Sequence, residues 1–486
     1  MSHTNNKRHH GKKKSALAGR NIVGKLITVL QFLLAVILLG FLWNSGLIPG
    51  KYLIAAGVVL IVLSGLTFGL QYVKSKVYIV GIIISVLISL LQVIGIVYLN
   101  QASQAVQDIG GANYKTDNMI VVVKEGKPVE TLLDMKNYRY GTQTMVDQEN
   151  TKLMVEEVNK ILGRDVHMTE YNTIQELAEA LLSGSVEAAI YNEAFTGIIE
   201  DAIPDYQSQV KIIYHYGIDT ELEVEDVSVE EPFNVYISGI DVSGPITTNS
   251  RSDVNIIATV NPETKKILLT TTPRDYYVKI PGVSGEQKDK LTHAGIYGID
   301  TSIATLEQIY DIEIPYYARV NFTSLIKIVD ILGGVDVSSD YSFSAGKYQF
   351  TEGMNHLDGE KALAFVRERH SFADGDNQRG KNQEKVLTAM IQKAMSPAIL
   401  TNASSLLSSV SSCLETNMPS NKISELIQMQ LNDGASWEIV SVNATGLGDK
   451  QACYSSGSQI LYVMQPDNTS VDDIKRKMQA VLTSAK

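Results

Sequence analysis

Two aspartates and an arginine in the middle of the chain have the residue types and spacing of a metal-binding site. Asp241 ends an apolar stretch, residues 233–240, and Asp253 follows Arg251 by two residues and opens the next apolar stretch, 254–260. Both carboxylates can therefore lie at one edge of a sheet, where loops build sites. Mg²⁺ takes one or two protein carboxylates and leaves its other positions to phosphate and water. On spacing alone, ordinary turns stabilised by Asp side chains are the commoner explanation.

An arginine follows the third strand of this region. Arg274 comes directly after the apolar stretch 266–272, in the sequence Pro-Arg-Asp. A guanidinium group at a strand end can bind two phosphate oxygens at once, because its planar fork matches their geometry. Considered alone, Arg274 is better explained by a surface ion pair.

A denser cluster of cationic and amide side chains follows later in the chain: Arg367, Arg369, His370, Arg379, Asn382 and Gln383. Arg379 and Gln383 share one face of a helix predicted over 379–395, and a helix N-terminus attracts anions. The cluster predicts an anion site. It is equally consistent with helix capping, in which a cation ends one helix and Asp376 or Asn377 begins the next.

The elements that position these residues alternate between strands and helices. Strands are predicted at 233–240, 254–260, 266–272 and 316–321, and helices at 301–310, 324–332, 360–365 and 379–395. This order predicts an α/β/α sandwich with a central, mostly mixed sheet over residues 232–395, extended by residues 396–486. A smaller α/β domain is predicted over 112–225. A short polar stalk, residues 100–111, precedes it and the acidic run 219–231 follows it as a linker.

Three apolar stretches near the N-terminus, 25–43, 51–73 and 77–99, are each long enough to cross a bilayer as a helix. The first hundred residues contain ten Lys and Arg and no Asp or Glu, and most of these cations precede the first span or separate the second from the third. We therefore expect a cytoplasmic tail, residues 1–24, and an extracellular location for everything after the third span. That exported part has a net charge of −21, which disfavours binding to nucleic acid.

The absence of common catalytic motifs and the positions of the histidines and cysteines limit the reactions that the chain could catalyse. The chain contains no HExxH, GxSxG, P-loop or CxxC motif, and three of its eight histidines lie in the N-terminal tail, so histidine-based metal chemistry is poorly supported. Cys413 and Cys453 both fall in the exported part, where a disulfide between them would be stable. Two free, buried thiols are the alternative.

The blocks GIDVSG, RSDVNI, TTPRD, HAGIYG, YYARVNF, LGGVDV, LAFVRERH and DNQRGKNQ, in this order, resemble the LytR-CpsA-Psr family. The three spans and the small domain look like its capsule-associated CpsA branch, from Gram-positive bacteria. Val254 departs from the family pattern, which often has Thr there. The resemblance implies a phosphotransferase that moves a glycopolymer, here capsular polysaccharide, from undecaprenyl pyrophosphate to peptidoglycan, with capsule-synthesis proteins as further partners.

Carried over block by block, the resemblance assigns roles to individual residues. Asp241 and Asp253 would hold Mg²⁺ or Mn²⁺. The pyrophosphate would be bound by Arg251, Arg274, Arg367, Arg369, Arg379 and Gln383. Asp275 and Asp376 remain two open candidates for the general base. The lipid also requires an apolar tunnel, for which aliphatic residues such as Leu325, Ile326 and Ile328 are candidates, although they serve equally well as ordinary core.

Two other functions fit the same residues. A hydrolase acting on lipid pyrophosphates would use the same site with water as the acceptor. A non-enzymatic regulator of capsule synthesis would signal through the basic tail, but the predicted cytoplasmic part is short.

Overall fold

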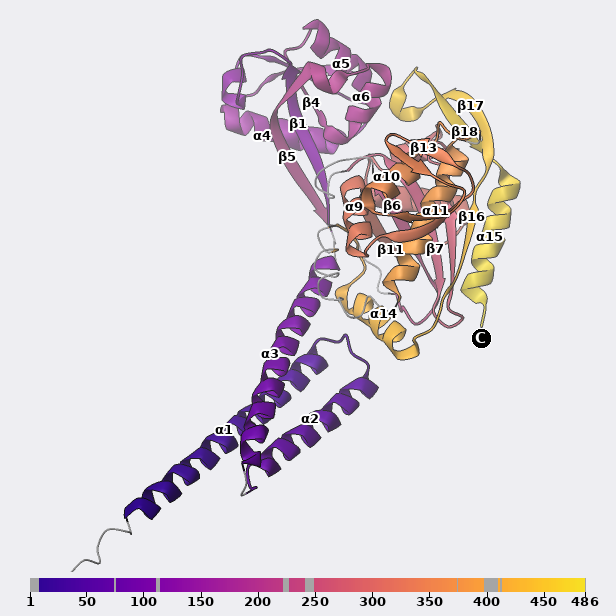
Figure 1. Cartoon of the computed structure of the whole chain (residues 1–486). Helices are drawn as coiled ribbons and strands as arrows, with labels where there is room; N and C mark the ends of the chain where they lie inside the picture. Colours follow the sequence, from indigo (N-terminus) through magenta and orange to yellow (C-terminus); the bar gives the residue numbers. More distant parts are fainter. Residues whose placement is uncertain are drawn as a thin grey trace, which may run out of the picture. The chain divides into compact units, whose positions relative to one another are not determined.

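The computed structural model describes residues 8–73, 76–110, 114–221, 227–240, 249–373, 375–396, 410 and 413–485; for residues 8–21, Tyr114, Asp376 and Asn377 it describes the backbone alone. The chain divides into two compact units. The first contains α1, α2, α3 and α14, and the second contains the remaining elements (Figure 1).

The first unit contains the three predicted spans. Helices α1 (Arg8–Asn44), α2 (Gly50–Leu70) and α3 (Val77–Ile109) each carry a stretch apolar and long enough to cross a membrane. Polar side chains meet between them: Gln31 Oε1 accepts hydrogen bonds from Thr67 Oγ1 at 3.0 Å and Ser85 Oγ at 2.6 Å. Because each of these residues comes from a different helix, the spans form a bundle with a hydrogen-bonded centre rather than three uniformly apolar rods.

The bundle also holds a helix from the C-terminal part of the chain. In α14 (Ser420–Asp433), Ile423 and Ile427 pack against Leu47, Ala102 and Val106. Lys51 Nζ donates to the carbonyl of Asn432 at 2.6 Å. Helix α3 continues through Ile109, so most of the segment predicted as a stalk is helical.

The second unit begins with the accessory domain. Its strands β1 (Tyr114–Lys124), β2 (Arg139–Gln143), β3 (His167–Tyr171), β4 (Ala188–Asn192) and β5 (Val210–Glu221) form a sheet of order β3-β2-β4-β1-β5. Side chains of β1 alternate between two cores. Ile120 and Val122 face α5 (Ile174–Ser183) and α6 (Thr196–Ala202), whereas Met119, Val121 and Val123 pack with residues of α4 (Gln148–Leu162).

The second sheet has the order β11-β6-β7-β8-β16. It is built from β6 (Phe233–Ile240), β7 (Ser252–Asn261), β8 (Lys266–Thr271), β11 (Tyr316–Asn321) and β16 (Glu438–Asn443). The pairs β11–β6 and β16–β8 are parallel, and the pairs β6–β7 and β7–β8 are antiparallel, so the sheet is mixed, as predicted.

Helices cover both faces of this sheet (Figure 1). On one face α8 (Ile299–Tyr310) and α15 (Asn468–Thr483) form a core with side chains such as Tyr236 and Leu268. On the other face lie α9 (Phe322–Ile331), α10 (Gly359–Arg367) and α11 (Asp376–Ala394). The predicted α/β/α sandwich is confirmed, and the C-terminal segment supplies its edge strand β16 and the covering helix α15.

Smaller elements complete the second unit. They are the short helix α7 (Leu291–Ala294) and the strands β9 (Tyr277–Val278), β10 (Asp289–Lys290), β12 (Val335–Ser339), β13 (Phe343–Ala345), β14 (Tyr348–Phe350), β15 (Gly353–Leu357), β17 (Gly446–Ala452) and β18 (Ile460–Pro466). The strands pair as antiparallel two-stranded ribbons, β9 with β10, β12 with β15, β13 with β14 and β17 with β18.

Of the two alternatives for the cysteines, the structure has the second: Cys413 and Cys453 are not joined by a disulfide, and both are buried. They are held by different parts of the domain. Cys413 lies two residues before Glu415, which pairs with Arg319 on the edge strand β11. Cys453 precedes Tyr454, whose backbone N–H bonds to the carbonyl of Lys288 beside β10. Burial raises the pKa of the Cys453 thiol to about 12, so this cysteine is protonated at neutral pH.

Candidate active site

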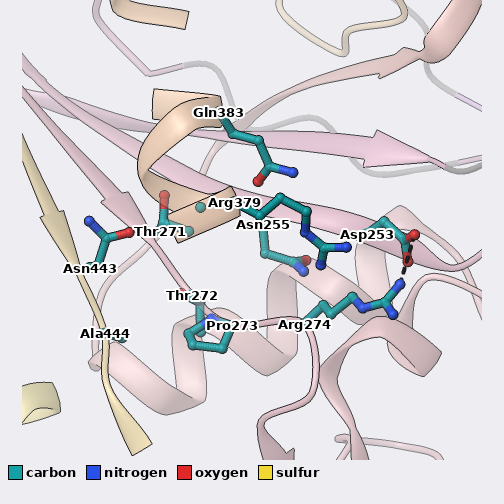
Figure 2. A pocket seen from close by; sticks show the side chains of 11 residues that line it. Asp253, Asn255, Thr271, Thr272, Pro273, Arg274, Arg379, Gln383, Asn443 and Ala444 are labelled. Carbon is teal, nitrogen blue, oxygen red and sulfur yellow. Dashed lines mark hydrogen bonds and ion pairs between the residues drawn. The ribbon is translucent and has the colours of Figure 1, made fainter. Parts of the chain in front are cut away.

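A small polar pocket lies at one edge of the second sheet, where β7 begins, β8 and β16 end and α11 starts (Figure 2). Its lining consists of Asp253, Asn255, Thr271, Thr272, Pro273, Arg274, Arg379, Gly380, Gln383, Asn443 and Ala444. Figure 2 shows the guanidinium groups of Arg274 and Arg379 and the amides of Asn255 and Gln383 turned toward one space. The pocket thus brings together four residues that the sequence predicted for one site: Asp253, Arg274, Arg379 and Gln383.

Arg274 is fixed by the turn that follows β8. The backbone N–H of Thr272 bonds to the carbonyl of Asn255 on the neighbouring strand at 2.9 Å. The Arg274 side chain then reaches back across the sheet edge, and its Nη1 lies 2.9 Å from Asp253 Oδ2. Asp253 Oδ1 also accepts a hydrogen bond from Thr292 Oγ1 at 3.2 Å. Asp253 therefore orients one of the two arginines of the pocket.

Arg379 and Gln383 lie on the first turns of α11, which comes close to the sheet at Gly380. A Cβ atom at Gly380 would lie 3.3 Å from both Asn443 Oδ1 and Thr271 Cγ2, tighter than usual packing allows. Only the smallest residue fits there without displacement, so Gly380 lets the helix N-terminus approach the ends of β8 and β16. The positive end of a helix close to two arginines favours anions.

Four residues of this site were missed by sequence reasoning: Asn255, Thr271, Asn443 and Glu384. Glu384 lies behind the lining, 3% exposed, and accepts hydrogen bonds from Thr271 Oγ1 at 2.7 Å and from Asn443 Nδ2 at 3.1 Å. Burial raises its pKa to about 7, although these two hydrogen bonds act in the opposite direction. A polar residue within the apolar stretch Ser252–Asn261 was the available sign for Asn255. No feature of the sequence pointed to Asn443, because its strand, β16, joins the sheet from the C-terminal segment.

Two of the arginines that the resemblance assigned to pyrophosphate binding lie outside the pocket lining. The guanidinium of Arg367 stacks over the ring of Phe322, 4.3 Å from its centroid. Arg369 Nε lies 3.4 Å from His370 Nε2. The end of α10 that precedes them is nevertheless tied to α11, because the Gln383 side chain donates to the carbonyl of Val366 at 3.4 Å.

The remaining predicted residues are placed as follows. Arg251 pairs with Asp201 of the accessory domain, with Nη1 and Oδ2 3.1 Å apart, and does not line the pocket. Asp275 is 7% exposed and its Oδ1 lies 3.1 Å from Lys290 Nζ. The backbone of Asp376 forms the first residue of α11. The prediction for Asp241, and for the side chain of Asp376, lies outside what the structure describes.

The donor set can be tested against Mg²⁺. In the part of the chain that the structure describes, no three His, Cys, Asp or Glu side chains are grouped to hold a metal ion. Asp253 contributes a carboxylate whose oxygens each have a second lone pair beyond the bonds already described. One carboxylate facing a phosphate site fits a Mg²⁺ ion that takes most of its oxygens from substrate and water. It does not fit an ion held in an all-protein cage.

An apolar cavity of about 220 Å³ adjoins the polar pocket, and Gln383 lines both. It lies between the sheet and α9, α10 and α11. Ile237, Ile256, Ala318 and Val320 of the sheet line one side, and Phe322, Leu325, Ile328, Val386, Leu387 and Met390 of the helices line the other. Leu325 and Ile328 thus have the predicted position, whereas Ile326 does not line the cavity. A polar pocket with two arginines beside an apolar cavity has the two kinds of surface that an amphiphile with an anionic head would require.

The chain belongs to the LytR_cpsA_psr family, whose profile matches residues 203–480, which confirms the resemblance and extends it beyond residues 232–395. It is 31% identical over 266 residues to the polyisoprenyl-teichoic acid–peptidoglycan teichoic acid transferase TagU of Bacillus mycoides, covering 54% of this chain and 84% of the relative. The enzyme of the same name from Enterococcus faecalis is 38% identical over 191 residues, covering 39% and 62%.

Solved structures of similar proteins were also found. The crystal structure of TagV from B. subtilis is 26% identical, covers 53% of this chain and 99% of that one, and has a TM-score of 0.45. A structure described as YwtF (TagT) with bound octaprenyl pyrophosphate lipid is 27% identical, covers 54% and 95%, and has a TM-score of 0.41.

Proposed function

We propose that this protein is a membrane-anchored transferase that moves a glycopolymer from undecaprenyl pyrophosphate to peptidoglycan, with capsular polysaccharide as the polymer and Mg²⁺ as the cofactor. The observation that carries the proposal is the contact between the arginine-containing pocket and the apolar cavity at Gln383. A pyrophosphate joined to a polyprenyl chain has the same two parts. The relatives named as polyisoprenyl-teichoic acid–peptidoglycan transferases support the same reaction class.

The residues of the pocket contribute mainly by charge and orientation. Arg274 and Arg379 bind the pyrophosphate oxygens, Gln383 holds them at the boundary with the lipid chain, and Asp253 orients Arg274 and supplies the Mg²⁺ ligand. Mg²⁺ neutralises phosphate charge when bound. Such electrostatic stabilisation is the dominant contribution to phosphoryl transfer, which needs little covalent help from the protein.

In the transfer step, the acceptor is a peptidoglycan hydroxyl group, the C6 hydroxyl of muramic acid. Its oxygen forms a bond to the phosphorus that carries the glycan. The bond from that phosphorus to the bridging oxygen breaks, and undecaprenyl phosphate leaves. The hydroxyl proton passes to a base. Of the two predicted bases we propose Asp376, at the start of α11, because the carboxylate of Asp275 is buried and bound to Lys290.

The topology proposed for the chain puts this reaction outside the cell. The positive charges around the first and second cytoplasmic segments favour an N-terminus in the cytoplasm, and three spans then export the catalytic domain. A lipid-linked donor on the outer leaflet and the cell wall are both accessible from that side.

The test is a transfer assay with the full-length protein in lipid nanodiscs, a lipid pyrophosphate-linked glycan and peptidoglycan fragments. We expect Mg²⁺-dependent attachment of glycan phosphate to peptidoglycan and a loss of about 100-fold in Arg379→Ala, the usual size for removing an electrostatic contact in such a site. Arg476→Ala, on the exposed face of α15, is the matched control. Donors carrying capsular repeats and teichoic acid are compared. Free glycan phosphate without transfer would instead identify a hydrolase.

A further inference from the structure

Glu384 connects three elements directly behind the polar pocket. It follows Gln383 on α11 and is 3% exposed. Its carboxylate accepts from Thr271 Oγ1, at the end of β8, and from Asn443 Nδ2, at the end of β16. The same carboxyl group therefore ties the helix that carries Arg379 to both strand ends that close the pocket.

These bonds set the spacing between the two arginines. Arg379 precedes Glu384 on α11 by five residues, and Arg274 follows Thr271 by three. The close approach at Gly380 leaves little space between the helix and the strands. A change at Glu384 should therefore alter the distance between Arg274 and Arg379.

We propose that Glu384 is a positioning residue of the anion pocket, and that its neutral form is the one that favours the pyrophosphate donor. The inference rests on the proposed function. A neutral carboxyl group keeps its contacts with Thr271 and Asn443 and adds no negative charge behind the phosphates. An ionised carboxylate at the same place repels them, because a buried charge is poorly screened by water.

The surroundings of Glu384 make both forms accessible near neutral pH. Burial raises its pKa to about 7, while Lys381 on the same helix lowers it. The strands face it with Thr271 and Asn443, which do not titrate, and the charged groups across the pocket are Arg379, Arg274 and Asp253. A dianionic ligand bound among these groups disfavours the ionised form further, so binding and protonation are coupled.

The experiment measures donor binding by calorimetry, with full-length protein in nanodiscs, between pH 6 and 8.5. The probe is undecaprenyl pyrophosphate carrying one sugar, because both of its phosphates are esterified and do not titrate near neutrality. We expect wild-type affinity to fall about tenfold over this range. We also expect proton uptake on binding near pH 7, seen as a dependence of the heat on the buffer's ionisation enthalpy.

Glu384→Gln separates charge from structure. This variant resembles the neutral form, so it should bind at every pH as the wild type does at pH 6, without proton uptake. Glu384→Leu loses the hydrogen bonds and should bind more weakly at every pH. Glu438→Gln, which removes an exposed charge from the same strand as Asn443, should behave as wild type. Wild-type protein that binds the probe with no pH dependence, or a Glu384→Gln variant that takes up the same proton, would overturn the inference. No binding at any pH contradicts the proposed function instead.

Discussion

The polar pocket and the apolar cavity are neighbours, yet their lining residues come from different parts of the strands and helices. The pocket takes its side chains from strand ends and from the first turns of α11, where backbone and side-chain polar groups converge. The cavity takes its side chains from the middle of the sheet and from three helices, and its polar members are Asn321 and Gln383. Asn321 is already used, because its Oδ1 caps α9 by accepting from the N–H of Ser324 at 2.9 Å. The Gln383 side chain bonds to the carbonyl of Val366, and Gln383 is the polar residue that lines both the cavity and the pocket.

This difference indicates how the site recognises an amphiphile. In the proposed function, charge in the pocket would select the head group, and apolar surface in the cavity would contribute roughly 25 cal/mol for each Å² that the lipid chain buries. Changes in the pocket should therefore affect all donors alike. Changes in the cavity should affect only donors with long chains.

The largest effect is expected in the pocket, from Arg274. Arg274→Ala removes a proposed phosphate ligand and leaves Asp253 with Thr292 as its remaining described partner, so transfer should fall at least about 100-fold. Arg274→Lys keeps the charge but not the planar fork, and should recover only part of this loss. Initial rates at saturating acceptor measure both. Equal rates in Arg274→Ala and wild type would show that the pocket does not bind the reacting group.

A second prediction concerns stability and follows from Glu384. Its pKa is about 7 in the folded protein and near the ordinary 4.5 when unfolded, so the folded state holds an extra proton between these values. The contribution of Glu384 to stability should consequently be fully present at pH 4.5 and below, and should be lost as pH rises through 7, by on the order of 3 kcal/mol once Glu384 is ionised.

Thermal unfolding of the wild type and Glu384→Gln at pH 5.5 and 8.5 measures this loss. The wild type should lose more stability than the variant between the two values. Glu438→Gln serves as the control, because its carboxylate is exposed. The same decrease in all three proteins would mean that another group is responsible.

Much of the fold could be predicted from local patterns. The limits of β6 and β11 agree with those predicted, and α8 ends at the predicted residue, because alternation along a strand and a 3.6-residue period along a helix are local properties. The pairing of β16 with β8 was not predictable in this way. It joins residues about 170 positions apart, and nothing in the sequence Glu438–Asn443 specifies its partner.

The site was predicted only in part, because local sequence blocks identify some of its residues and long-range strand pairing brings in the others. Asp253, Arg274, Arg379 and Gln383 have charges or amides in recognisable blocks, and the structure brings them together. Glu384 follows Gln383 immediately, but its role depends on Asn443, which arrives with β16. Arg251 shows the opposite error. It is two residues from Asp253, but it lies before β7 begins at Ser252, outside the regular alternation of the strand, and its side chain pairs with Asp201 of the accessory domain.

The third prediction alters the cavity without touching the pocket. Ala318 lines the cavity on β11, so Ala318→Leu fills space that the lipid chain would occupy. Affinity for a donor with an undecaprenyl chain should fall about tenfold, since displaced methylenes are worth about 0.8 kcal/mol each. Affinity for a pyrophosphate with a chain of two isoprene units should not change. Ala452→Leu on the surface ribbon β17–β18 is the matched control, and equal losses for both chain lengths would argue against a lipid site.

The smallest effect is expected at Arg251, which the sequence placed among the phosphate ligands. Its guanidinium pairs with Asp201 and is about a quarter exposed, so the pair should contribute about 0.5–1 kcal/mol to stability, as a double-mutant cycle with Arg251→Ala and Asp201→Ala would measure. Transfer by Arg251→Ala should stay within about threefold of wild type, because the charge lost points away from the pocket. If its rate instead fell as far as that of Arg274→Ala, Arg251 would have to leave Asp201 and enter the pocket during the reaction. The boundary between the anion site and the accessory domain would then change as the donor binds.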